Sequence, residues 1–253
     1  MRLPLPLVVA AMMVPSALHS APAETAKAEA NWITLGTIGG PVANAHRSQP
    51  ANALLTDQGA ILVDAGDGTV EQLAKAGIPL ARVRAVVLSH LHWDHTAGLQ
   101  AVLGLRYQAD TPGKLRIYGP PGTAALVAGL IVSMKPAAEA GYGDPNAAHV
   151  DPGDMVEVTE LAEGSKVALT PAVTMVAAQN THYGFPAGGE LDRKFKSFFY
   201  RFQLPSRSIV YTGNTGPSPA VEQLAHGADS PGERDDRRSD YGCSHSTQRA
   251  RHA

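Results

Sequence analysis

The chain has almost no cysteine and little net charge, and each shortage excludes a class of site. Its 253 residues include one cysteine, Cys243, and the formal net charge at pH 7 is −2. A single cysteine allows no internal disulfide and no thiolate zinc cage, so any metal would be held by histidine and carboxylate side chains. No long basic or Gly-Arg-rich arm is present, which argues against a strongly electrostatic nucleic-acid binder.

The remaining composition is that of a globular protein. Hydrophobic residues make up 44% and charged residues 17%, which is enough apolar material for one large domain or two small ones. The 25 glycines and 19 prolines predict many turns. No internal repeat of short fixed period is visible. Strand-like and helix-like segments alternate along the chain, which indicates an α/β fold.

The first 23 residues are typical of a secretory signal peptide. Arg2 precedes an apolar run from Leu3 to Leu18, and Ala21-Pro22-Ala23 is a small-x-small cleavage site. The alternatives are a disordered apolar leader or a membrane anchor. The run contains three prolines and ends early for a transmembrane helix. We therefore expect a periplasmic or secreted protein without a stable membrane anchor.

The chain changes character at Ser230. Residues 230–253 contain no Val, Ile, Leu, Met, Phe or Trp and are rich in Arg and Asp. Such a segment cannot bury a core face, so a disordered, atypical tail is expected after a folded domain at residues 24–229.

Several elements can be read from the pattern within that domain. Residues 51–69 and 196–214 each predict a hairpin, because two apolar runs flank a turn. Residues 83–90, "VRAVVLSH", predict a strand that is buried on both faces. The expected helices cover residues 70–77, 95–104, 124–135 and 218–227, the last with Ser218 as its N-cap, and a loop is expected at residues 136–153.

Three histidines and an aspartate gather directly after the buried strand. In "SHLHWDHTAGL", His90 and His92 alternate so that both imidazoles point the same way, and Asp94 and His95 follow in the next turn. Imidazole and carboxylate ligands suit Zn²⁺, with Fe or Mn as alternatives. The other interpretation is a polar surface turn with clustered histidines. The position of the histidine cluster at the end of a buried strand favours a metal site.

This motif resembles the signature of the metallo-β-lactamase superfamily. "LGTIGGP", "DAGDGTVEQL", "IYGPPGT" and "YTGNTGPS" are similar to stretches of its ribonuclease Z-like branch, in the expected order from about Trp32 to Asp229. The resemblance implies an αβ/βα four-layer sandwich with metals at one edge between two sheets. It also implies a hydrolase that uses metal-activated water.

The resemblance assigns a role to each candidate residue. His90 and His92 would bind the first metal with a third histidine from a later strand, which is His182; His149 and His226 are the alternatives, although no such strand precedes them. Asp94 and His95 would bind a second metal, and Asp94 would also orient or deprotonate the attacking water. Asp64 would orient a ligand histidine from outside the coordination shell. Taken alone, His182 could be a capping or surface histidine and Asp64 a turn residue.

Two departures from the family pattern bear on the second metal. Asn214 occupies the position of the bridging aspartate, and a neutral amide is a poorer bridge between two cations than a carboxylate is. We expect Asn214 to be a weak ligand. The charged tail stands where the family has a further strand, helices and a last histidine. We hypothesise a change of reading frame near Ser230, and we do not expect His245 or His252 to replace the missing ligand, because ordering a flexible tail is costly.

These observations predict an exported zinc hydrolase of small esters such as phosphodiesters, sulfate esters or lactones. One zinc is expected, with a weakened second site. Nucleic acid is not expected as a partner, because transfer RNA is not exported. An incomplete C-terminal part would leave an apolar sheet face uncovered, which predicts self-association. The alternatives are an inactive metal-binding remnant and a cytoplasmic RNA 3′-processing endonuclease.

Overall fold

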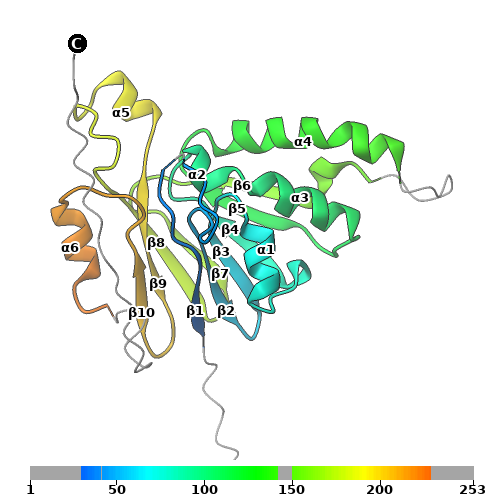
Figure 1. Cartoon of the computed structure of the whole chain (residues 1–253). Coiled ribbons are helices and arrows are strands. Elements are labelled where there is room, and N and C mark those ends of the chain that lie inside the picture. Colours follow the sequence, from blue (N-terminus) through cyan, green and yellow to red (C-terminus); the bar gives the residue numbers. More distant parts are fainter. Residues whose placement is uncertain (1–29, 41, 142–149, 229–253) are drawn as a thin grey trace, which may run out of the picture.

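A computed structural model describes residues 30–40, 42–141 and 150–228. The signal-peptide prediction, the tail prediction and His149, His245 and His252 lie outside these residues. Two β-sheets pack face to face, and helices lie on both outer sides (Figure 1). This is the expected α/β sandwich.

The larger sheet has six strands in the order β1-β2-β3-β4-β5-β6. β1, β2 and β3 pair antiparallel, whereas β3, β4, β5 and β6 pair parallel. Its strands are β1 Asn31–Gly36, β2 Ala51–Thr56, β3 Gly59–Ala65, β4 Val83–Val87, β5 Leu115–Gly119 and β6 Val156–Glu160. The parallel strands are joined by helices, as crossover connections require.

The smaller sheet is antiparallel, with the order β10-β9-β8-β7. Its strands are β7 Lys166–Thr170, β8 Val173–Gln179, β9 Phe198–Gln203 and β10 Ser208–Tyr211. Alternate residues of β9, namely Phe198, Tyr200 and Phe202, are fully buried between the sheets. The predicted hairpins β2–β3 and β9–β10 are both confirmed.

The helices α1, α3 and α4 cover the larger sheet, and α5 and α6 lie by the smaller one (Figure 1). The helices are α1 Thr69–Lys75, α2 Trp93–Thr96, α3 Leu99–Gln108, α4 Thr123–Ala140, α5 Glu190–Lys194 and α6 Pro219–Ala225. As predicted, the hydroxyl of Ser218 caps α6 by accepting a hydrogen bond from the Val221 N–H at 3.4 Å.

Two helix predictions were wrong in detail. The helix expected at residues 95–104 is divided into α2 and α3 near Gly98, whose N–H donates a hydrogen bond to Ala65 O of β3 at 2.8 Å. The loop expected from Pro136 begins later, since α4 continues through Pro136 to Ala140. Pro136 lies on the exposed side of α4, where water can satisfy the carbonyl that loses its N–H partner.

Helix α4 is also long and apolar enough to cross a membrane by length and composition. Its inward side chains Val127, Ile131 and Met134 belong to the core of the larger sheet. The helix therefore serves here as a covering layer of the sandwich.

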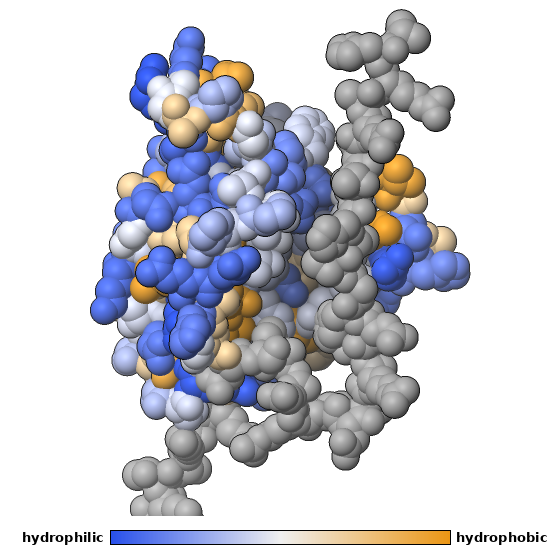
Figure 2. Space-filling model, turned by 90° about the vertical axis from the view of Figure 1, so that its left-hand side faces the viewer, coloured by the Kyte–Doolittle hydropathy of each residue, from blue (hydrophilic) through white to orange (hydrophobic). Residues whose placement is uncertain are grey.

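The outward face of the smaller sheet is only partly covered. Phe199 is buried there, whereas Val176 and Val210 remain half-buried. Figure 2 shows this side of the molecule, where apolar patches appear among hydrophilic side chains. Self-association through this face stays a prediction.

Two glycines let α2 and α3 approach the end of β3. A Cβ on Gly98 would overlap the carbonyl oxygen of Gly66, and a Cβ on Gly66 would overlap that of Asp94. The backbone of Gly98 also donates a hydrogen bond to Ala65 O at 2.8 Å. Glycine at both positions therefore allows α2 and the start of α3 to pack on the end of β3.

Gly98→Ala should destabilise the protein by about 1–3 kcal/mol, because the methyl group has no room. Gly104→Ala is the matched control: Gly104 lies in α3, and nothing lies within 4 Å of the place that its added methyl group would occupy. Alanine there should be neutral or stabilising by up to about 1 kcal/mol. Urea unfolding of both variants measures the difference. Equal stabilities would contradict the close packing.

Candidate metal centre

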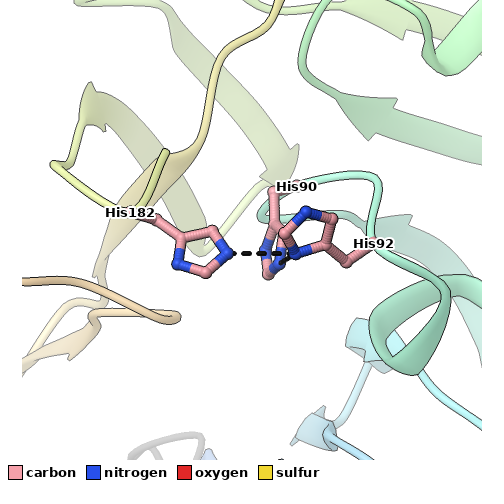
Figure 3. A group of neighbouring side chains, drawn as sticks. All are labelled: His90, His92 and His182. Carbon is pink, nitrogen blue, oxygen red and sulfur yellow. Dashed lines mark hydrogen bonds between the residues drawn. The ribbon is translucent and has the colours of Figure 1, made fainter. Parts of the chain in front are cut away.

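The candidate metal centre lies at the edge where β3, β4, β8 and β10 end. His90 and His92 follow β4 and precede α2, and His182 lies in the loop after β8. Figure 3 shows His182 facing His90 and His92 from the opposite side. The structure thus brings together the three histidines predicted for the first metal.

The three imidazoles converge on a common point. His92 Nδ1 lies 3.2 Å from His90 Nε2 and 3.1 Å from His182 Nε2. Ligand nitrogens about 2.0–2.1 Å from a tetrahedral zinc would be roughly 3.3–3.4 Å apart. The nitrogen separations therefore fit a zinc ion bound by all three residues.

The protonation states also suit metal binding. Burial, followed by the neighbouring His95, His182 and His92, lowers the pKa of His90 far below its usual range. Burial, with the neighbouring His92 and His95, also lowers the pKa of His182 to about 4, although Asp94 opposes this. Both residues are neutral at pH 7, and a neutral imidazole nitrogen is the form that binds a metal.

A second group of possible ligands adjoins the first. His90, Asp94 and His95 have ligand atoms within 4.8 Å of one another. His95 Nε2 is buried without a hydrogen-bond partner among the described residues, and it lies 3.6 Å from Asp94 Oδ2. An unpartnered buried nitrogen beside a carboxylate fits a metal ligand.

Asp64 contacts these candidate ligands from outside the two groups. Its buried carboxylate accepts hydrogen bonds from the Ser89 N–H at 2.7 Å, the Ser89 hydroxyl at 2.8 Å and the Tyr211 hydroxyl at 2.6 Å, and it lies 2.7 Å from His95 Nδ1. Burial lowers the pKa of His95, but the Asp64 and Asp94 carboxylates outweigh it and raise the pKa. The Nδ1–H of His95 therefore faces Asp64, which leaves Nε2 for a metal.

Ser89 orients His90 in the same way. Its hydroxyl proton goes to Asp64, so the hydroxyl oxygen must accept the proton of His90 Nδ1, 3.0 Å away. The Nε2 of His90 then carries the free lone pair. Asp64 has a left-handed backbone, with φ of 58°, which is uncommon for a non-glycine residue and is held by the surrounding contacts.

Asn214 lies in the loop after β10, next to the cluster. A Cβ on the preceding Gly213 would lie 3.2 Å from the Cβ of Ser89. Asn214 itself is half-buried, and its role as a weak ligand stays a prediction. The alternative histidine His226 caps the C-terminus of α6 and belongs to neither ligand group.

Several residues of the centre were not identified from the sequence. The side chain of Asn180 joins two loops, because it accepts a hydrogen bond from the His182 N–H and donates one to Thr212 O, both at 3.1 Å. The Gly40 N–H donates to Asp94 Oδ2 at 2.9 Å. Ser89 and Tyr211 both occur inside recognised motifs, "SHLHWDH" and "YTGNTG", which could have drawn attention to them.

Comparison with known proteins agrees with this geometry. A family profile described as a beta-lactamase superfamily domain matches residues 60–231. Two solved structures share the fold: zinc-bound PqqB from Methylobacterium extorquens (TM-score 0.56, 18% identity, 78% of this chain and 70% of that chain) and the short form of human tRNase Z (TM-score 0.53, 20% identity, 77% and 73%). The chain belongs to the metallo-β-lactamase superfamily of hydrolases.

Within that superfamily the chain is ribonuclease Z-like. It is 30% identical over 200 residues to ribonuclease Z of Mycobacterium marinum and 31% identical over 201 residues to that of Mycobacterium bovis. In both comparisons the match covers 78% of this chain and 67% of the relative. The chain thus spans about two thirds of the length of these relatives.

Loss of His182 should weaken zinc binding. His182→Ala removes one of three converging nitrogens, and we expect affinity to fall by about 100-fold or more, since changes outside the coordination shell alone cost about 10–100-fold. Competition with a chromophoric chelator measures the affinity. His226→Ala should bind zinc as the unmodified chain does, and equal affinities for all three proteins would contradict the assigned site.

Proposed function

We propose that the protein is a zinc-dependent hydrolase of small esters such as phosphodiesters, sulfate esters or lactones. The observation that carries this proposal is the convergence of three imidazole nitrogens at tetrahedral spacing. His92 is exposed and His182 half-buried, so the convergence point can be reached from solvent. Three histidine ligands with access for water are typical of catalytic zinc sites.

The histidines would hold the metal, and Asp94 would accept a proton from the attacking water. When bound, Zn²⁺ polarises the bond under attack and makes water a stronger nucleophile at neutral pH. Asp94 is 8% exposed, and its Oδ2 is held by the Gly40 N–H. A carboxylate fixed in this way can orient the attacking water and accept its proton.

We propose one tightly bound zinc. The first group supplies three histidines, whereas the second supplies Asp94 and His95 besides His90, which the two groups share. Asn214 would add only a neutral amide oxygen between the two cations, which offsets their repulsion poorly. The second ion should therefore bind weakly.

RNA 3′-processing is the second candidate function, and it is favoured by the identity of 30–31% to ribonucleases Z. Our proposal of small esters instead depends on export to the periplasm or beyond, which residues 1–23 suggest and which would separate the protein from transfer RNA. The third possibility, an inactive metal-binding remnant, would keep the zinc but lose turnover.

A substrate panel distinguishes the three candidates. Zinc-loaded protein would be tested with bis(p-nitrophenyl) phosphate, an aryl sulfate, a lactone and a precursor transfer RNA. We expect turnover of at least one small ester and no cleavage of the RNA. Cleavage of the RNA alone would establish the second candidate. Tight zinc binding without any turnover would establish the remnant.

Asp94→Asn should lower the rate on an active small ester by about 10²–10⁴-fold, because asparagine keeps an oxygen for the Gly40 N–H but cannot accept a proton. The first zinc should still bind, since its three histidines are unchanged. Steady-state kinetics and zinc analysis of the same preparation test both statements. An unchanged kcat would show that Asp94 does not take part in the proton transfer.

A further inference from the structure

Aromatic residues occur on both segments that supply the histidines of the metal centre. Trp93 directly follows His92 at the start of α2, and Tyr183 directly follows His182 in the loop before α5. Phe185 lies two residues further along the same loop. None of these three residues is a candidate metal ligand. The Tyr183 hydroxyl accepts a hydrogen bond from the Leu91 N–H at 3.5 Å, which holds its ring beside the histidines.

Tyr183 and Phe185 form one continuous aromatic surface. Their rings are 5.3 Å apart and nearly parallel, with an interplanar angle of 28°. The Tyr183 ring lies 5.2 Å from that of His92, 5.3 Å from that of His182 and 6.0 Å from that of His90. The ring pair therefore begins at the zinc ligands and leads away from them.

Within the described residues, the Trp93 side chain has no hydrogen bond or ring contact that would explain a tryptophan at this position. It is 84% exposed, which is more than any other large hydrophobic side chain in the described part of the chain. An indole left in water at the edge of a binding site gains contact area when a ligand covers it. Leu91, which lies between the two ligand histidines, is half-buried and adds further apolar surface.

We propose that Trp93, Tyr183 and Phe185 form a subsite for an aromatic ring of the substrate, while its anionic or ester group lies at the histidines. This inference rests on the proposed hydrolase function and specifies its substrate class as esters that carry an aryl or similar planar group. Aromatic rings stack favourably in offset or edge-to-face geometry, so the subsite selects a planar apolar group over a small alkyl group.

Binding of two phosphonates to the zinc-loaded protein tests the subsite without any turnover. Phenylphosphonate and methylphosphonate offer the same anionic group, have no ester bond to cleave and differ in the ring. Isothermal titration should show phenylphosphonate binding about tenfold more tightly or better. Equal affinities for the two compounds would overturn the proposal.

Variants of the aromatic residues then show where the phenyl ring of phenylphosphonate binds. Phe185→Ala and Trp93→Ala should each reduce the preference for phenylphosphonate to less than about threefold, with little change for methylphosphonate. Phe195→Ala is the matched control, because Phe195 is also partly exposed (37%) but lies at the end of α5 under Lys194. A preference that survives both site variants, or that Phe195→Ala removes, would overturn the assignment.

The result of the phosphonate test can be distinguished from the result of the ester panel that tests the proposed function. If the ester panel shows no turnover but the ring preference is present and depends on Phe185, the subsite stands and the hydrolase proposal fails. If esters are hydrolysed but phenyl and methyl compounds bind alike, the hydrolase stands and the subsite fails.

Discussion

The buried carboxylate of Asp64 is the interaction on which the metal centre depends. It accepts hydrogen bonds from Ser89 after β4 and from Tyr211 on the second sheet, and it contacts His95 on α2. Burying a charge without partners is strongly unfavourable, so all of these groups must be present together. Burial and the Asp64 charge hold the pKa of Tyr211 well above its usual range, so its hydroxyl stays protonated and donates. One carboxylate thereby joins the two sheets and sets the tautomers of His90 and His95.

Close backbone packing between α2 and the end of β3 supports the contacts of Asp64. Gly66 and Gly98 let α2, which carries Asp94 and His95, pack on the end of β3, where Asp64 lies. Near the smaller sheet, the Asn180 side chain links the loop of His182 to the loop of Asn214 by hydrogen bonds to His182 N–H and Thr212 O. The candidate ligands therefore come from loops and from the short helix α2, and each segment is held at a strand end by hydrogen bonds or by close packing on a glycine. Such pre-organisation is what a catalytic metal site requires.

We propose that Trp93 serves a different purpose from these anchors. Asp64, Ser89 and Tyr211 are buried or half-buried and bonded to one another, whereas Trp93 is exposed. Residues that hold ligands can be satisfied within the protein, but residues that select a substrate must keep free surface for it. This contrast separates the machinery common to a superfamily hydrolase from the side chains that we propose adapt it to one class of ester.

Much of this centre followed from the sequence alone. The spacing of His90, His92, Asp94 and His95 after a buried strand is local, so the chain order already determines that these side chains lie together, and the hairpins and the α/β class follow from equally local patterns. Pairing of His182 with His92 across 90 positions, the donation from Tyr211 to Asp64 and the extension of α4 through Pro136 were decided by the tertiary structure. These features depend on how the two sheets pack and on which helix side faces water. No local pattern encodes such contacts, because they exist only when distant strand ends meet at one edge.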